Sequence, residues 1–195
     1  SCSRIDESDF NAHGLPYWTQ TTGQDSSCTN LTARKTQFTY TKDGTTVASD
    51  GYLPFQVTNA NNHITTLNYD IGFGTPIKQT DANSIVTETL LDAIGRPLAI
   101  SATGVPTQYI RYRLASDGSH APPHAQWLTR RQSQGAPIQE SYTDSLGRPL
   151  RAATEGFDGS YRYLDKTFDT RGNLLTESLP YTAGDTIHKT VFADF

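Results

Sequence analysis

The sequence predicts an all-β protein built from tandem antiparallel β-hairpins, and three observations predict it. A short unit, in which an aromatic residue precedes Asp and Gly follows three residues later, recurs at a fixed spacing, so that Asp144, Asp169 and Asp194 lie 25 residues apart. Turn signals separate short runs that are rich in β-branched and aromatic residues. No 3.6-residue apolar period persists for three turns, so we expect almost no helix. A fixed period in this range is typical of a repeat architecture.

The unit occurs in five copies and the start of a sixth. Two copies share the tetrapeptide Gly-Arg-Pro-Leu, at 95–98 and 147–150, whereas the copy at 69–76 has one extra residue and the copy at 10–16 is weaker. We expect the aromatic residue to end a strand, Asp to close a turn by bonding its own backbone, and Gly to adopt a positive φ. The predicted motif residues are Tyr69, Asp70, Gly74, Asp92, Gly95, Arg96, Asp144, Gly147, Arg148, Phe168, Asp169, Gly172 and Asn173.

These units resemble the YD (tyrosine–aspartate) repeats of bacterial RHS proteins and of the B component of insecticidal Tc toxins. The family pattern is Tyr-Asp-x-x-Gly followed by Arg or Asn, and then a longer section with Gly and Tyr. Residues 144–148, 156–163 and 169–173 match it, and the resemblance covers about residues 10–195.

Three positions depart from the family pattern. Thr143 and Leu91 stand where the family has Tyr, and Asn11 stands where it has Asp. These departures weaken single units and not the series. The resemblance implies hairpins wound into a hollow shell that encloses a toxic C-terminal segment. The spacing alone predicts only tandem hairpins, which would form a curved, twisted open sheet, part of a larger β-shell.

Local patterns place the strands one by one. Residues 36–41 alternate apolar and polar side chains before the turn signal Asp43-Gly44, and 53–58 return as a strand that Pro54 bends or places at an edge. The run 84–91 has some helical character, but its β-branched residues favour a strand. We expect strands at 36–41, 53–58, 65–69, 84–91, 108–114, 126–131, 137–143, 160–168 and 186–193.

One face of the sheet is expected to carry the contacts between units, because no unit can bury its own face alone. Within 108–114, alternation puts Ile110, Tyr112 and Leu114 together on one side. The residues expected on the contact face are Tyr69, Ile110, Tyr112, Leu114, Tyr142, Tyr161, Tyr163 and Phe168.

Two regions follow from these patterns, an irregular N-terminal segment at 1–35 and a hairpin array at 36–195. The segment contains both cysteines of the chain, Cys2 and Cys28. They form either a disulfide that closes a loop and indicates an oxidising compartment, or two unpaired thiols. A short strand is conceivable at 17–20.

The composition excludes several classes of function. The net charge of −4 and the pI of about 5.7 predict no nucleic-acid partner and no anionic membrane surface. No apolar run approaches the ~20 residues that span a bilayer. The chain has no Met, and its last residues begin a new unit, so we expect a piece of a longer protein.

A search for chemistry finds no convincing active site, and we expect no enzyme, no cofactor and no metal. His120 and His124 are four residues apart, but Pro122 and Pro123 between them forbid a helix that would align them, so they are expected to be solvated. Repeated Asp residues suit turns better than catalysis, and calcium binding by stacked Asp is the alternative. The carboxylate signature of the self-cleaving core of RHS proteins is absent.

The basic residues that follow the glycine of the unit leave two possibilities open. In the first, Arg96 and Arg148 make contacts, either by packing over neighbouring rings or by pairing with the Asp of an adjacent unit. In the second, both side chains are exposed.

The resemblance implies a structural function, as a wall segment of an encapsulating shell in a large secreted or surface-delivered bacterial toxin. Its partners would be the remainder of its own parent polypeptide, including a toxic passenger, and open sheet edges would favour self-association. The alternative is an adhesin-like binding module on a bacterial surface, in which exposed aromatics and the loop 116–125 recognise glycan or a receptor.

Overall fold

The computed structural model describes residues 4–24, 27–29, 31–48 and 50–192. These residues form sixteen β-strands and one short 3₁₀ turn, with no α-helix among them. Consecutive strands pair antiparallel, so the predicted all-β fold of tandem hairpins is confirmed. The chain divides into two compact units, Ser1–Val105 and Pro106–Phe195, which are described separately. No helix in the described part of the chain has the length and apolar character that a membrane span requires.

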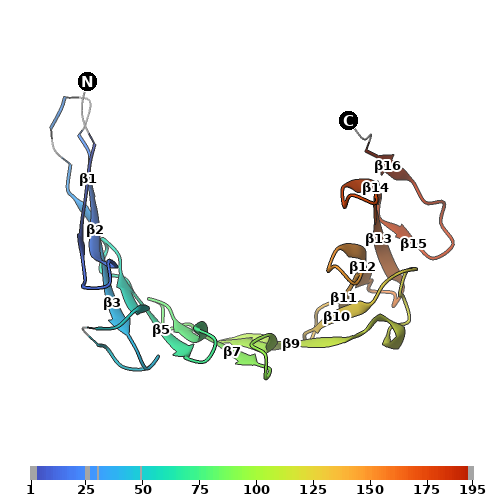
Figure 1. Ribbon diagram of the computed structural model, residues 1–195, viewed down its shortest axis with the longest axis horizontal. Coiled ribbons are helices and arrows are strands. Elements are labelled where there is room, and N and C mark those ends of the chain that lie inside the picture. Colours follow the sequence, from blue (N-terminus) through green and yellow to red (C-terminus); the bar gives the residue numbers. More distant parts are fainter. Residues whose placement is uncertain (1–3, 25–26, 30, 49, 193–195) are drawn as a thin grey trace. The chain divides into compact units, whose positions relative to one another are not determined.

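The first unit is a succession of hairpins in which each strand pairs with its neighbours along the chain (Figure 1). Its strands are β1 (Ile5–Phe10), β2 (Pro16–Thr22), β3 (Arg34–Thr41), β4 (Leu53–Thr58), β5 (Ile64–Asp70), β6 (Thr75–Thr80), β7 (Val86–Leu91) and β8 (Pro97–Ala102).

The second unit continues the same principle. Strands β9 to β14 pair in chain order, β16 pairs with β14, and the two-residue strand β15 pairs with β13. The elements are β9 (Val105–Leu114), η1 (Ala115–Asp117), β10 (Trp127–Gln132), β11 (Gln139–Thr143), β12 (Pro149–Glu155), β13 (Tyr161–Phe168), β14 (Leu174–Ser178), β15 (Tyr181–Thr182) and β16 (Lys189–Val191).

Six hairpins share one irregularity of register, a bulge close to the turn. The bulge lies next to the last or second-last residue pair of the hairpin. In that pair, the residue of the second strand is proline in five hairpins and leucine in the sixth. Proline cannot donate to a ladder of hydrogen bonds, so it suits a place where the pairing is already interrupted. The pairs are Phe10↔Pro16, Tyr40↔Pro54, Tyr69↔Pro76, Leu91↔Pro97, Thr143↔Pro149 and Phe168↔Leu174.

The N-terminal segment at 1–35 corrects the expectation of irregular structure. It contains β1 and β2, which pair with each other, and β2 also pairs with β3. All six residues of β1 are exposed, so hydrogen bonds to β2 and not burial hold this strand in place, among them the bond from Thr21 Oγ1 to Asp6 Oδ1 at 2.6 Å. No apolar pattern marks such a strand in the sequence.

One of the two alternatives for the cysteines, a disulfide between Cys2 and Cys28, falls partly on a residue that the structure does not describe. Cys28 is disulfide-bonded, whereas Cys2 lies outside the described residues.

The strand register corrects the expected single contact face in the second unit. Leu128 pairs with Arg113 on one side and with Tyr142 on the other. Residues directly opposite one another share a face, so Tyr142 lies on the face of Arg113 and not on that of Leu114. Leu114 is 53% exposed, whereas Tyr142 is fully buried. A shift of one residue in the register moves every side chain of a strand to the other face of the sheet. Alternation within one strand therefore does not predict which residues of the neighbouring strand lie on the same face.

Buried apolar side chains are few and distributed along the chain. Ala115, Leu128 and Tyr142 form a small core in the second unit, against which Ala125 packs. Because each hairpin buries little by itself, its stability depends on the hairpins at its sides. The other buried apolar side chains among the described residues are Tyr40, Tyr69, Ile110 and Ala153.

Candidate functional site

Six turns of the structure share one hydrogen-bond pattern. In each turn, Oδ1 of the first residue accepts bonds from the backbone N–H groups two and four residues later, at 2.8–3.0 Å. The N–H of that first residue donates to the carbonyl four residues on. These turns begin at Asn11, Asn59, Asp81, Asp92, Asp144 and Asp169.

The fourth residue of each turn has a left-handed backbone. Gly95, Gly147 and Gly172 have φ values of 84°, 80° and 92°, at no steric cost because glycine has no Cβ. In two turns Asn62 (φ 61°) and Ser84 (φ 62°) take this place. The turn at Asp81 therefore has no glycine, and sequence analysis did not find it for that reason.

The turn at Asp70 differs because of its extra residue. Its Oδ1 accepts from the N–H of Phe73 at 3.1 Å, and Gly74 has a φ of 60°. The Phe73 ring lies so close to Gly95 that a Cβ there would meet Cδ1 at 2.8 Å. This contact joins the β5–β6 turn to the β7–β8 turn, which is a second reason for glycine at position 95.

The second carboxylate oxygen of the turn binds the side chain four residues later. Arg96 Nε donates to Asp92 Oδ2 at 2.8 Å, and Arg148 Nε donates to Asp144 Oδ2 at 2.6 Å. In the next turn the carboxamide of Asn173 donates to Asp169 Oδ2 at 3.0 Å. Each side chain thus pairs with the Asp of its own unit, so the alternative of pairing with an adjacent unit is wrong. The alternative of packing over a neighbouring ring is confirmed for Arg148, whose guanidinium lies over the Phe168 ring at 5.2 Å from the centroid.

These contacts lower the pKa of the turn carboxylates. For Asp92, the backbone N–H of Arg96 is the largest cause, and the guanidinium adds to it. Burial opposes ionisation of Asp144, but hydrogen bonds from the backbone and side chain of Arg148 prevail, so its pKa also falls. The arrangement stabilises ionised carboxylates as fixed acceptors and leaves them unsuited to proton transfer near neutral pH.

Tyrosine hydroxyls join one hairpin to the preceding hairpin in the first unit. Tyr40 Oη donates to the carbonyl of Pro16 at 2.7 Å, and Tyr69 Oη donates to that of Pro54 at 2.8 Å. Both rings are buried. The aromatic residue of the repeated unit therefore bonds the proline of its neighbour, which explains why a tyrosine suits this place.

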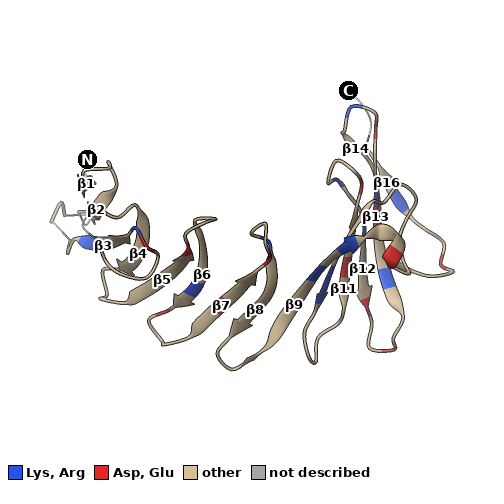
Figure 2. Cartoon of the chain, turned by 60° about the horizontal axis from the view of Figure 1, so that its bottom comes forward, with Lys and Arg blue, Asp and Glu red and all other residues tan. Residues whose placement is uncertain are grey.

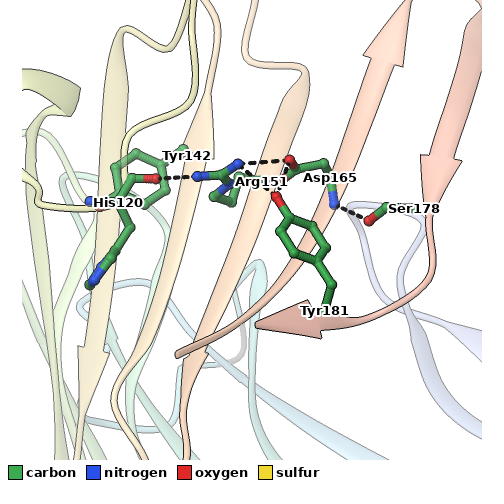
Figure 3. Close-up of polar contacts among 6 residues, drawn as sticks. All are labelled: His120, Tyr142, Arg151, Asp165, Ser178 and Tyr181. Atoms are coloured by element: carbon green, nitrogen blue, oxygen red, sulfur yellow. Dashed lines mark hydrogen bonds and ion pairs between the residues drawn. The ribbon is translucent and has the colours of Figure 1, made fainter. Parts of the chain in front are cut away.

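A polar network crosses β12, β13 and β15 in the second unit (Figure 3). Arg151 binds both carboxylate oxygens of Asp165 at 2.7 Å and also donates to Tyr181 Oη at 2.9 Å. Tyr181 in turn donates to Asp165 Oδ2 at 2.7 Å, and the N–H of Asp165 donates to Ser178 Oγ at 2.8 Å. These bonds connect β12, β13, β14 and β15.

The segment 115–126, which we call the strap, is held to the sheet through His120. The His120 carbonyl accepts from Arg151 Nη1 at 3.0 Å, and its Nδ1 lies 2.9 Å from Glu140 Oε2. The imidazole stacks on Tyr161 with ring centroids 4.0 Å apart. His120 is therefore half-buried and bonded, which corrects the expectation of a solvated loop residue.

Gly118 allows the strap to approach the sheet closely. A Cβ at this position would overlap the hydroxyl of Tyr142 and lie 3.0 Å from Leu128 Cδ2. The Tyr142 hydroxyl donates to Glu140 Oε2 at 2.8 Å and accepts from the N–H of His120 at 3.3 Å. Strap and sheet thus share one buried hydrogen-bond cluster.

The pKa values of the tyrosines and of the carboxylate in this network shift in opposite directions, although burial acts to raise all of them. Burial raises the pKa of Tyr181 to about 12, with help from the adjacent Asp165 carboxylate. It also raises the pKa of Tyr142, to which Glu140 contributes. For Asp165 burial acts against ionisation, but the bonds from Arg151 and Tyr181 lower its pKa on balance. The tyrosines stay neutral and the carboxylate stays charged over the physiological range.

A cavity of ≈ 330 Å³ lies beside this network, with the strap as one wall. Its lining combines apolar, basic and acidic side chains, and Figure 2 shows how charged residues are distributed over the strands of the second unit. It is lined by Pro122, Pro123, His124, Asp144, Arg148, Leu150, Arg151, Asp165, Lys166, Thr167, Phe168, Thr176 and Lys189.

Only three of the predicted motif residues meet at this cavity, Asp144, Arg148 and Phe168. The others lie in their own turns. The network residues Arg151, Asp165, Glu140 and Tyr181 escaped sequence analysis, because opposite charges on two strands reveal a pair only when the register is known. No group of three or more His, Cys, Asp or Glu among the described residues could hold a metal ion.

Comparison with known proteins finds similar structures. No protein-family model and no curated protein matches the chain. A crystal structure of TcdB2-TccC3 is similar with a TM-score of 0.59 and 18% identity, over 91% of this chain and 11% of that one. A crystal structure of TcdB2-TccC3-Cdc42 is similar with a TM-score of 0.52 and 13% identity, over 98% and 12%. At this identity the likeness concerns the fold alone, so the hairpin array of this chain shares the fold of the matched part of TcdB2-TccC3.

Proposed function

We propose that the chain is a wall segment of an RHS/Tc-type shell in a large bacterial toxin that is secreted or displayed at the cell surface. The observation that carries this proposal is the likeness to TcdB2-TccC3 over 91% of the chain, in a structure of which the chain spans only 11%. The function of a wall segment is containment of a passenger and involves no reaction, in keeping with turn carboxylates that serve as hydrogen-bond acceptors.

The sheet edges support continuation of the wall by further strands. All side chains of β1 are exposed, and among the described strands β1 pairs with β2. Likewise, among the described strands β16 pairs with β14. An unpaired strand edge readily accepts another strand. The partner we propose at these edges is the remainder of the parent polypeptide, and self-association is the outcome when that remainder is missing.

The test is protease protection of the passenger in the natural polypeptide that contains this segment. Val57 pairs with Phe38 on one side and with Thr65 on the other. Val57→Pro should open the wall at β4, because proline removes a backbone donor and disrupts the strand. We expect a passenger that resists limited proteolysis in the parent polypeptide and is cleaved in this variant.

Val47→Pro is the matched control, because Val47 lies in the connection between β3 and β4 and is 58% exposed. It should leave the passenger protected. A polypeptide without any protected segment, or equal protection in both variants, contradicts the containment function.

The alternative of a glycan-binding module depends on aromatics gathered in one groove. Two large exposed aromatics of the second unit are Tyr109 and Trp127. Trp127 pairs with Leu114 and Tyr109 pairs with Gln132, so alternation puts these two rings on opposite faces of the sheet. This placement favours the wall over a glycan platform.

A further inference from the structure

We propose that the cavity beside the strap binds a carboxylate carried on an aromatic or aliphatic body. The inference goes beyond the proposed wall function, which assigns no ligand. It rests on one positioned guanidinium, on an apolar lining and on an excess of positive charge.

Arg148 is held in place but retains free donors. Its Nε binds Asp144 Oδ2 at 2.6 Å, and its guanidinium lies over the Phe168 ring at 5.2 Å from the centroid. Within the described part of the chain, its two terminal nitrogens donate to no side chain or carbonyl. A guanidinium fixed in this manner offers two parallel N–H groups, whose geometry matches both oxygens of a carboxylate. Because the side chain is already ordered, binding costs little additional entropy.

The charges around the cavity do not cancel. Three of the cations are paired with a carboxylate: Arg148 with Asp144, Arg151 with Asp165, and Lys166 with Glu177. Lys189 also lines the cavity, and it has no ion pair with any residue that the structure describes. The local charge is therefore positive in a chain whose net charge is −4, so an anion is the favoured ligand.

The apolar lining defines the rest of the ligand. Phe168, Leu150, Pro122 and Pro123 border the cavity, and its volume of ≈ 330 Å³ is at the lower end of the range for small-ligand sites. Inorganic phosphate would satisfy the cations but leave this surface in contact with water. A carboxylate attached to a phenyl or branched alkyl group uses both features.

Calorimetric titration of the 195-residue chain tests the proposal with defined probes. The acid 3-phenylpropionate represents a small-molecule source, and acetyl-Asp-Phe-amide represents a carboxylate within a peptide. Binding of either acid supports the site and identifies the source. Failure of both acids overturns the proposal. Equal binding of the uncharged 3-phenylpropanamide, or equally tight binding of inorganic phosphate, also overturns it.

Arg148→Asn is the decisive variant, because Asn173 shows that asparagine fits the same turn and binds its Asp. The turn should remain while the guanidinium is lost, and affinity should fall about tenfold or more, as for loss of a charged hydrogen bond. Arg96→Asn changes the equivalent turn at a residue that does not line this cavity, and it should leave affinity unchanged. Equal affinity of the two variants refutes the role of Arg148, whereas the wall function would stand because its protease test is independent.

Discussion

The hydroxyl of Tyr69 donates to the carbonyl of Pro54 at 2.8 Å and so bonds β5 to the preceding hairpin. Tyr40 makes the same contact with Pro16. Tyr69 lies three residues after Thr66, and Pro54 lies two residues before Gln56, the residue that pairs with Thr66. Tyr40 and Pro16 lie in the same way relative to the pair Gln37↔Trp18. The bond is thus a repeated connection between hairpins.

Tyr69→Phe should lower the free energy of unfolding by about 0.5–1.5 kcal/mol, because the variant loses one hydrogen bond and leaves a carbonyl without its partner. Urea denaturation followed by circular dichroism measures the change. Tyr109→Phe removes a hydroxyl from a ring that is 57% exposed and should have almost no effect. A loss of the same size in both variants would refute the contribution of this bond.

Leu91→Tyr should stabilise the chain by a similar amount, about 1 kcal/mol. Leu91 lies three residues after Glu88, and Pro76 lies two residues before Lys78, the residue that pairs with Glu88. Tyr69 and Pro54 have the same relation through the pair Thr66↔Gln56. A new hydroxyl at position 91 can therefore reach the Pro76 carbonyl. The midpoint of urea unfolding should rise. Leu90→Tyr, on the opposite face and 62% exposed in the parent, is the control and should not raise it.

Acid should destabilise the turns as their carboxylates become protonated. The pKa of Asp144 lies below its ordinary value near 3.8. A depressed carboxyl pKa contributes stability above that ordinary value, and this contribution is lost as pH falls from about 3.8 through the lower folded value. The urea midpoint should therefore fall in this acidic window and not between pH 5 and 7.

Asp144→Asn tests the assignment of that acid sensitivity. Asn11 accepts the same two backbone bonds through its amide oxygen, so the turn should survive the change. The loss of stability in acid should become smaller than in the parent. An unchanged pH profile would show that Asp144 does not contribute to it.

Gly118→Ala should destabilise the strap by about 1–3 kcal/mol, since a methyl group at this position overlaps the buried Tyr142 hydroxyl and the site has no room. Thermal unfolding measures the loss, and hydrogen exchange at His120 should become faster if the strap separates from the sheet. Ser119→Ala alters an exposed neighbour and serves as the control. Wild-type stability of Gly118→Ala would contradict the close approach.

The turns could be predicted from sequence because their chemistry is local. Asp92 and Arg96 form all their shared bonds within five residues, and a fixed period repeats the signal. The turn at Asp81 was missed because Ser84 takes the place of glycine. The strand β1 was missed because its exposed side chains carry no pattern of burial.

The network and the cavity could not be predicted from sequence. Arg151 and Asp165 are fourteen residues apart and meet only because β12 and β13 pair in one register. His120 reaches Glu140 because the strap folds back over the sheet. Neither distance follows from spacing along the chain.

The sequence by itself determined the hairpin array, since Asp, Gly and strand-forming residues act over a few neighbours and recur with a fixed period. Tertiary structure alone decided which faces carry Tyr142 and Leu114, how Arg151 and Asp165 meet, and where a cavity remains beside Arg148. The physical reason is that turn geometry depends on short-range hydrogen bonds, whereas register and side-chain contact depend on strands that only folding brings together.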